Sequence, residues 1–228
     1  MIWEALPVLS FMNLPPLYLL SGLCADERLF QFLQLNHPSP KVIQWISPDP
    51  EDTMATYATK LISQMEPGQD PPVLIGLSFG GMMAQEIAKQ IKVKRVILLS
   101  SLADTRKLPL HYRVAGALQM QHWLPLSLFK QMVLPAYWLF GAKTQEEKGI
   151  LKTILQETDI PFLRWSLQQI LDWRHQASQE NVIVLHGDRD KVLPVPAHPS
   201  LHLIKGGEHL MVMSRAKEVS AILNRYLA

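Results

Sequence analysis

The sequence has little charge, a single cysteine and no long apolar run. Charged residues make up 18% of its 228 residues and hydrophobic residues 48%, whereas typical soluble domains are about 25% charged. One cysteine excludes an internal disulfide and fits a reducing compartment, so we expect a cytoplasmic protein. The 22 Lys and Arg residues nearly balance the 20 Asp and Glu residues. The net charge of +2 therefore lacks the basic excess of a nucleic-acid-binding protein.

No apolar stretch reaches the ~20 residues that a membrane span requires. The first 20 residues are apolar, but they contain Glu4, three prolines and no basic segment, which argues against a secretory signal. A chain of this length and apolar content can bury a core without disulfides or a structural metal. We therefore predict a globular protein with a single domain over residues 1–228.

Six short apolar runs, each followed by a small residue or a turn, predict buried β-strands. They occupy residues 17–20, 42–46, 73–75, 95–99, 182–185 and 201–204. All but the last are nearly continuous rather than alternating, which is typical of strands buried on both faces. Helical spacing lies between them at 54–65 and 83–91, and a last helix over 219–226 has Ser214 as its expected cap. This alternation predicts an α/β fold, a mostly parallel sheet of about six strands with helices on both faces.

The alternation stops between residues 104 and 180, where apolar residues recur at helical spacing. This stretch is interpreted as a helical lid inserted over the carboxyl ends of the strands. Its methionines and aromatic residues would either line an acyl pocket or, as is more common, form core. It holds four of the six tryptophans: Trp123, Trp138, Trp165 and Trp173.

The pentapeptide Gly76-Leu77-Ser78-Phe79-Gly80 lies directly after a predicted strand and directly before a predicted helix. That context is the one a nucleophile elbow requires, because the glycines allow the sharp turn that holds the serine Oγ clear of the sheet. The turn also places Ser78 at the positive end of the following helix. A small-residue turn without chemistry is the alternative interpretation.

A serine nucleophile needs a histidine base oriented by a carboxylate. His209 follows the last predicted strand in Gly206-Gly207-Glu208-His209, where a loop can bring it back over Ser78. The alternative is that His209 is a surface-loop residue. The other seven histidines lie in the helical stretch, in loops, within a strand or before an acidic loop: His37, His111, His122, His175, His186, His198 and His202.

The loop after the penultimate strand supplies the candidate acids. We favour Asp190, which lies further along this loop toward the expected imidazole, whereas Asp188 can brace the turn through its backbone. Asp104, which follows the preceding strand, is the third possibility, and a plain acidic turn is the fourth. His186 and Asp188 match no zinc-ligand spacing, so we predict no metal and no cofactor.

These three segments together resemble the α/β-hydrolase superfamily, and the sequence is similar to its small serine hydrolases with a helical lid. The resemblance extends over nearly the whole chain from about Leu17. It implies a catalytic triad of Ser78, Asp190 and His209, in which the carboxylate fixes the imidazole tautomer. It also implies an oxyanion hole formed by the backbone N–H groups of Phe79 and Leu23.

Two features depart from the family pattern. Many members have His-Gly after the first strand, where this chain has Ser21-Gly22. The departure leaves the N–H of Leu23 in place but changes how the loop is held. Members also commonly begin with an antiparallel hairpin, which the 16 residues before Leu17, with three prolines, are not expected to form. In the same loop, Cys24 is expected to be a buried filler rather than a thiol facing the substrate.

Taken together, these expectations describe a hydrolase of carboxylic esters that acts on a small acyl substrate through an acyl-enzyme. We expect no nucleic-acid partner and no segment that spans a membrane, and the sequence does not set the oligomeric state. Thioester hydrolysis, C–C bond hydrolysis and a cofactor-free lyase reaction would use the same triad. A non-catalytic protein that binds a small apolar ligand is the alternative from another class.

Overall fold

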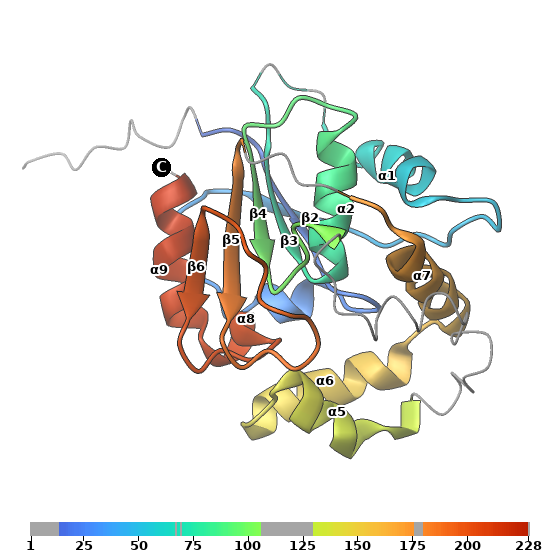
Figure 1. Ribbon diagram of the computed structural model, residues 1–228, viewed down its shortest axis with the longest axis vertical. Coiled ribbons are helices and arrows are strands. Elements are labelled where there is room, and N and C mark those ends of the chain that lie inside the picture. The colour runs from blue at the N-terminus through green and yellow to red at the C-terminus, as the bar shows by residue number, and fades with distance from the viewer. Residues whose placement is uncertain (1–13, 67, 69, 106–129, 176–179, 228) are drawn as a thin grey trace, which may run out of the picture.

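The computed structural model describes residues 14–66, 68, 70–105, 130–175 and 180–227 (Figure 1). Six strands of this part of the chain form one sheet, in the order β2-β1-β3-β4-β5-β6, and every neighbouring pair is parallel. The predicted parallel sheet is therefore confirmed. The strands are β1 (Leu17–Leu20), β2 (Pro40–Ile43), β3 (Val73–Leu77), β4 (Arg95–Leu99), β5 (Val182–Gly187) and β6 (Leu201–Ile204).

The strand order reverses between β1 and β3, because β2 lies on one side of β1 and β3 on the other. In register, Leu20 of β1 pairs with Gly76 of β3, which pairs with Leu98 of β4. Loops that leave the carboxyl ends of β1 and β3 therefore lie side by side. Such a reversal point is where open α/β sheets bind their ligands.

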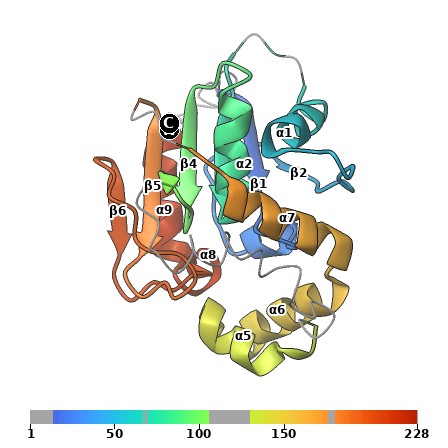
Figure 2. The ribbon, with the colours of Figure 1, turned by 45° about the vertical axis from the view of Figure 1, so that its right-hand side comes forward.

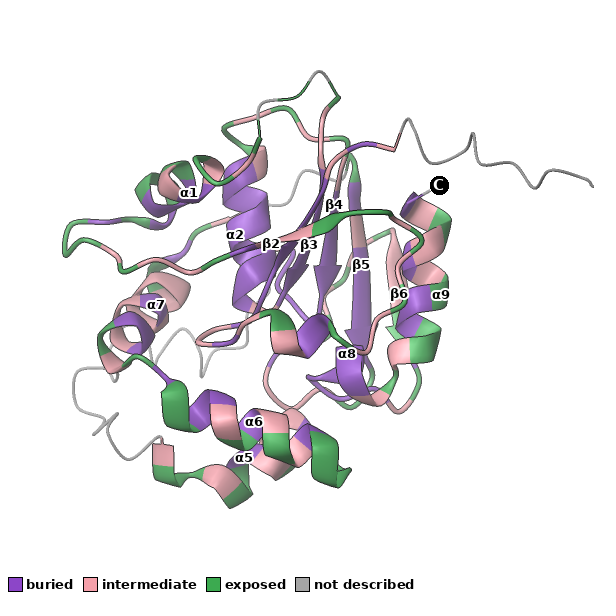
Figure 3. Ribbon diagram, turned by 180° about the vertical axis from the view of Figure 1, so that it is seen from behind, coloured by how far each residue is buried: buried purple, intermediate pink, exposed green. Residues whose placement is uncertain are grey.

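Alternate residues of the strands point into two hydrophobic clusters, one on each face of the sheet. On the first face, Tyr18, Leu74 and Leu98 pack against α1 (Met54–Ile62) and α2 (Phe79–Ala88). Residues 79–87 of α2 are all buried, so this helix is enclosed along almost its whole length (Figure 3).

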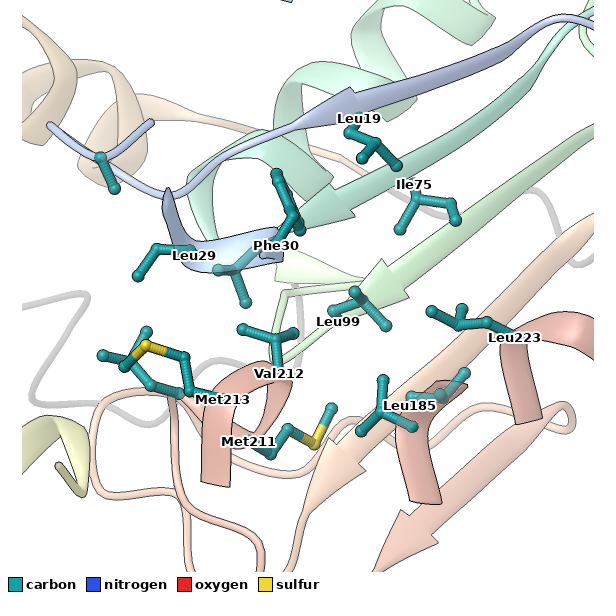
Figure 4. Close-up of a cluster of buried hydrophobic side chains, with 14 of the residues drawn as sticks. Leu19, Leu29, Phe30, Ile75, Leu99, Leu185, Met211, Val212, Met213 and Leu223 are labelled. Atoms are coloured by element: carbon teal, nitrogen blue, oxygen red, sulfur yellow. The ribbon is translucent and has the colours of Figure 1, made fainter. Parts of the chain in front are cut away.

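On the opposite face, Leu19, Ile75 and Leu99 pack against the short 3₁₀ helix η2 (Glu27–Phe30), α8 (Met211–Ser214) and α9 (Ala216–Leu227). Figure 4 shows Met211, Val212 and Met213 of α8 in this cluster, beside Leu29 and Phe30 of η2. Helices on both faces cover the sheet, which explains why its strands read as continuous apolar runs rather than alternating ones.

The described residues between β4 and β5 form three further helices: α5 (Val133–Phe140), α6 (Gln145–Glu157) and α7 (Ile160–Asp172). Thr144 caps α6 in a capping box with Glu147, and the Asp159 side chain accepts a hydrogen bond from Phe162 N–H to cap α7. Figures 1 and 2 both show α5 and α6 beyond the carboxyl ends of the strands. Trp123 of the predicted helical stretch lies outside the described residues.

Some boundaries differ from those the sequence predicts. β2 begins at Pro40 and ends at Ile43, and α2 begins at Phe79, four residues earlier than its apolar spacing indicates. Ser214 does not cap the last helix but ends α8, because the chain turns at Arg215 before α9. The segment expected to lack a hairpin is described only over residues 14–16, which form no strand.

The first turn of α2 approaches β1 so closely that Gly80 has no room for a side chain. A Cβ at Gly80 would overlap the carbonyl oxygen of Leu20, whereas a Cβ at Gly149 within α6 would meet no atom within 4 Å. We expect Gly80→Ala to lower the free energy of unfolding by about 1–3 kcal/mol. We expect Gly149→Ala to raise it by about 1 kcal/mol, because alanine favours the helix. Urea unfolding measures the free energy of unfolding of both variants. Equal changes in the two variants would contradict the close packing at Gly80.

Candidate active site

Ser78 occupies the sharp turn between β3 and α2 with a left-handed backbone, φ 52° and ψ −116°. Such a conformation is strained for a residue with a side chain and persists only where the surroundings enforce it. Here Ser78 N–H donates to Leu99 O at 2.9 Å, and Ser101 Oγ donates to Ser78 O at 2.6 Å. β3, β4 and the loop after β4 therefore hold both ends of the Ser78 peptide.

His209 lies between Ser78 and Asp190. Its Nε2 is 3.0 Å from Ser78 Oγ, and its Nδ1 is 2.8 Å from Asp190 Oδ2. The His209 and Asp190 side chains are 2% and 0% exposed. A carboxylate at Nδ1 holds the proton there and leaves the Nε2 lone pair facing the serine hydroxyl. The arrangement can accept a proton from Ser78.

Asp190 is a buried carboxylate that hydrogen bonds stabilise from several directions. Its Oδ1 accepts from Val192 N–H at 2.8 Å and Leu193 N–H at 3.0 Å, and His186 Nε2 lies 3.2 Å from Oδ2. Burial alone would raise the Asp190 pKa, but the hydrogen bonds from His186 and His209 outweigh it and hold the pKa well below its usual range. The acid therefore remains charged at neutral pH.

The competing candidate Asp188 faces elsewhere. Asp188 Oδ1 accepts a hydrogen bond from Gly206 N–H at 2.6 Å, so its side chain joins the loops after β5 and β6. Nδ1 of His209 bonds to Asp190 and not to Asp188 or Asp104. His186 also lies close to this site, contacting the acid rather than the nucleophile.

The loop after β1 is held beside Ser78 by its own polar groups. Ser21 Oγ donates to Ala25 O at 2.5 Å, and Trp45 Nε1 donates to Gly22 O at 3.1 Å. A Cβ on Gly22 would lie 3.8 Å from Ser78 Cβ, which places this loop directly against the nucleophile. Ser21 thus closes the loop through its own hydroxyl. No hydrogen bond from Leu23 N–H or Phe79 N–H occurs among those of the described residues.

An apolar cavity of about 370 Å³ opens at Ser78 and His209. Its floor includes Leu77, Met82 and the loop after β1. The facing wall comes from Leu151, Ile154 and Leu155 of α6 and from Leu163, Leu167, Ile170 and Leu171 of α7. Trp138, Trp165 and Trp173 do not line this cavity, so the acyl-pocket alternative fails for these three tryptophans. Trp173 is buried, as the more common core role predicts, whereas Trp138 is 68% exposed.

A sequence model of the alpha/beta hydrolase family matches residues 14–222. The chain belongs to the alpha/beta hydrolase family. No curated protein matches it. A putative lipase from Acinetobacter baumannii has a similar solved structure, with a TM-score of 0.71, 15% identity, and coverage of 95% of this chain and 84% of that one.

Two more solved structures share this hydrolase fold. A thermophilic esterase from Thermogutta terrifontis gives a TM-score of 0.63 at 16% identity, with 93% of this chain and 89% of that chain covered. The structure of MenH from S. aureus gives a TM-score of 0.65 at 13% identity, with 93% of each chain covered. These likenesses show the fold alone, since related folds carry different reactions.

Sequence reasoning about this hydrolase missed the residues beside the acid and the base. Lys191, next to Asp190, donates to Glu208, next to His209, at 2.7 Å, and also to Trp138 O in α5 at 3.0 Å. Burial raises the Glu208 pKa, but Lys191 and Lys143 lower it more and keep the carboxylate charged. α5 is therefore tied to both loops. The opposite charges of Lys191 and Glu208, each adjacent to a predicted site residue, were the only sequence sign of this pair.

Phe140 and His186 complete the surroundings of the base and the acid. The Phe140 ring lies 5.6 Å from the His209 ring, and Phe140 O accepts a hydrogen bond from Leu210 N–H. His186 is fully buried and its Nε2 also lies 3.2 Å from Leu193 O. An imidazole nitrogen that faces two oxygens carries the proton, so His186 donates toward Asp190. Its place at the end of a strand, before the acidic loop, is the pattern that could have indicated this role.

Within the described ranges, no group of three or more His, Cys, Asp and Glu side chains is arranged to hold a metal ion. Nor does any helix there combine the length and apolar character needed to cross a bilayer.

Cys24 is half-buried and lines the cavity, so the expectation of a buried filler is wrong about its position. Burial, with a smaller contribution from Asp159, raises the pKa of its thiol to about 12. At pH 8 a thiol with this pKa has far less thiolate than a free cysteine of pKa about 8.5. We expect iodoacetamide to alkylate the native protein at least ~100-fold more slowly than the urea-unfolded chain.

Intact-mass analysis over time measures this rate at the only cysteine of the chain. Glutathione at the same pH serves as the control for reagent activity. Equal rates for native and unfolded protein would show that the thiol is neither shielded nor kept protonated by its surroundings.

Proposed function

We propose that this hydrolase cleaves carboxylic esters through an acyl-enzyme on Ser78, with His209 as the base and Asp190 as the acid. The supporting observation is the continuous chain of hydrogen bonds from Asp190 through His209 to Ser78, at 2.8 and 3.0 Å. It ends at a serine held in a strained turn that faces an apolar cavity. A protein that only binds a ligand needs neither feature.

In the proposed reaction, Ser78 Oγ attacks the ester carbonyl carbon while its proton passes to His209 Nε2. The π-electron pair of the C=O bond moves to oxygen, and the resulting oxyanion accepts hydrogen bonds from the N–H groups of Leu23 and Phe79. As the carbonyl re-forms, the C–O bond to the alcohol breaks and His209 returns the proton to the leaving oxygen. Water then attacks the acyl-enzyme with the same base and releases the acid.

Asp190 stabilises the imidazolium that forms in each of these steps. Because its pKa is held well below the usual range, the carboxylate does not compete with His209 for the proton. His186 Nε2 lies 3.2 Å from the same oxygen, Oδ2, and helps to hold the carboxylate in position. Val192 and Leu193 N–H fix the second oxygen.

We further propose that residues 1–228 form one domain, in which the helical stretch between β4 and β5 acts as the lid of the cavity. The support is that α6 and α7 form its wall, while Lys191 and Glu208 attach α5 to the loops of the acid and the base. A cytoplasmic location stays a prediction from the cysteine content.

The test is reaction with a fluorophosphonate, which labels an activated serine covalently. We expect one adduct on Ser78 in the wild-type protein, none in Ser78→Ala, and labelling slowed by at least ~10³-fold in His209→Ala. Asp190→Asn should lower kcat for p-nitrophenyl butyrate by ~10³–10⁴-fold through loss of the correct tautomer. Asp188→Asn is the matched control and should retain activity within about threefold.

Circular dichroism and unfolding curves establish that each variant is folded. A folded wild-type protein that takes no label and hydrolyses no ester would overturn the hydrolase proposal in favour of a binding protein. Loss of activity in Asp188→Asn, with activity retained in Asp190→Asn, would show that the acid is Asp188 and not Asp190.

A further inference from the structure

The cavity beside Ser78 carries information about the substrate that the triad alone does not. Of the 21 described residues that line it, none is Asp, Glu, Lys or Arg. Apart from Ser78 and His209, the polar side chains are Cys24 and Thr158. Among the described lining residues, a substrate group that enters this cavity therefore meets no charge of either sign beyond the catalytic residues.

The two remaining polar side chains are not available to a ligand as hydrogen-bonding groups. Thr158 Oγ1 donates to Ile154 O at 2.9 Å, within its own helix turn, and Thr158 is only 2% exposed. The Cys24 thiol interacts with Thr158, and its raised pKa keeps it uncharged. A buried carboxylate, ammonium or hydroxyl on the substrate would lose its water here without a replacement partner, which is costly.

The wall is aliphatic rather than aromatic. α6 and α7 contribute only leucine and isoleucine, and Phe140 is the one phenylalanine, tyrosine or tryptophan among the described lining residues. Flat rings are usually held by aromatic faces, whereas branched aliphatic side chains pack well around a flexible alkyl chain. The composition thus favours an alkyl group over an aryl group.

The volume sets an approximate size. A protein cavity of roughly 150 Å³ holds one benzene molecule, so the 370 Å³ here corresponds to roughly 15 non-hydrogen atoms. Part of that space belongs to the ester group and its alcohol. An acyl chain of about eight to twelve carbons fills what remains.

From this composition and volume we propose that the cavity binds an uncharged, unbranched aliphatic acyl chain of medium length and that it excludes acyl groups with a terminal charge. The proposal rests on the proposed ester hydrolase, since it assigns the acyl group that Ser78 would receive. It places selection by chain length on the half-buried side chains of α7, of which Leu167 is one.

The experiment is a series of p-nitrophenyl esters from acetate to palmitate. We expect kcat/KM to rise about threefold to fourfold for each added CH₂ as the chain enters the cavity, and to fall once it is filled. The p-nitrophenyl monoester of adipate has the same six-carbon chain as the hexanoate with a carboxylate at its end. It should react at least ~100-fold more slowly than the hexanoate.

Leu167→Trp tests the location of the acyl group. Leu167 is half-buried and lines the cavity, so a larger side chain can extend into the empty space without overpacking the core. We expect kcat/KM for the decanoate to fall at least tenfold and that for the acetate to change by less than twofold. Leu134→Trp is the matched control, because Leu134 of α5 is 77% exposed and does not line the cavity.

The outcomes separate this proposal from the hydrolase proposal. Hydrolysis with no dependence on chain length, equal rates for hexanoate and adipate monoester, or equal effects of Leu167→Trp and Leu134→Trp would overturn the acyl-chain assignment alone. If no ester reacts and no phosphonate adduct forms, the hydrolase proposal fails. Calorimetry with sodium decanoate and sodium acetate on the Ser78→Ala protein then tests whether the cavity binds an alkyl chain. Tighter binding of decanoate than of acetate supports the acyl-chain assignment, and equal or absent binding overturns it.

Discussion

The close approach of three backbones at Ser78 determines the rest of the site. The end of β3, the first turn of α2 and the end of β1 meet where Gly76 and Gly80 leave no room for a Cβ. This packing forces Ser78 into its left-handed conformation and brings the loop after β1 against it. Ser78 is held at the edge where all six described strands end. Only there can His209, Leu23 and the cavity all lie next to its hydroxyl.

A second constraint is the burial of a negative charge next to an apolar cavity. Asp190 is fully buried, and a charge in that position is costly unless hydrogen bonds compensate it. His186, His209 and two backbone N–H groups supply those bonds. In such a dry environment they are stronger than in water, and they orient the imidazole toward Ser78. The low polarity that would exclude a charged substrate also strengthens the hydrogen bonds on which the base depends.

Most of the sheet could be predicted from the sequence because its strands are short apolar runs with abrupt ends. β1, β4 and β6 begin and end at the predicted residues. β2 was placed too late in the chain, because this edge strand is partly exposed and its apolar residues continue beyond the paired segment. The first turn of α2 was missed because Gly80 and Gly81 have low helix propensity, and tertiary packing overrides it.

The sequence singled out the three residues that the structure brings together at Ser78, since chain order and strand ends restrict the choices. It could not indicate that Lys191 and Glu208 attach α5, or that residues of α6 and α7 line the cavity with Ser78. Those contacts join segments far apart in the sequence, and no local periodicity records them. Of the two roles that the sequence left open for the tryptophans, pocket lining does not apply to Trp165 and Trp173, which instead donate hydrogen bonds to Asp52 O and to Glu86 of α2.

The most direct test of this account is a crystal structure of the protein after reaction with an octyl fluorophosphonate. We expect a bond from phosphorus to Ser78 Oγ, with one phosphonyl oxygen within hydrogen-bonding distance of Leu23 N–H and Phe79 N–H. The octyl chain should lie between α6 and α7. Phosphorus on another residue, or an oxygen that faces away from both N–H groups, would contradict the account.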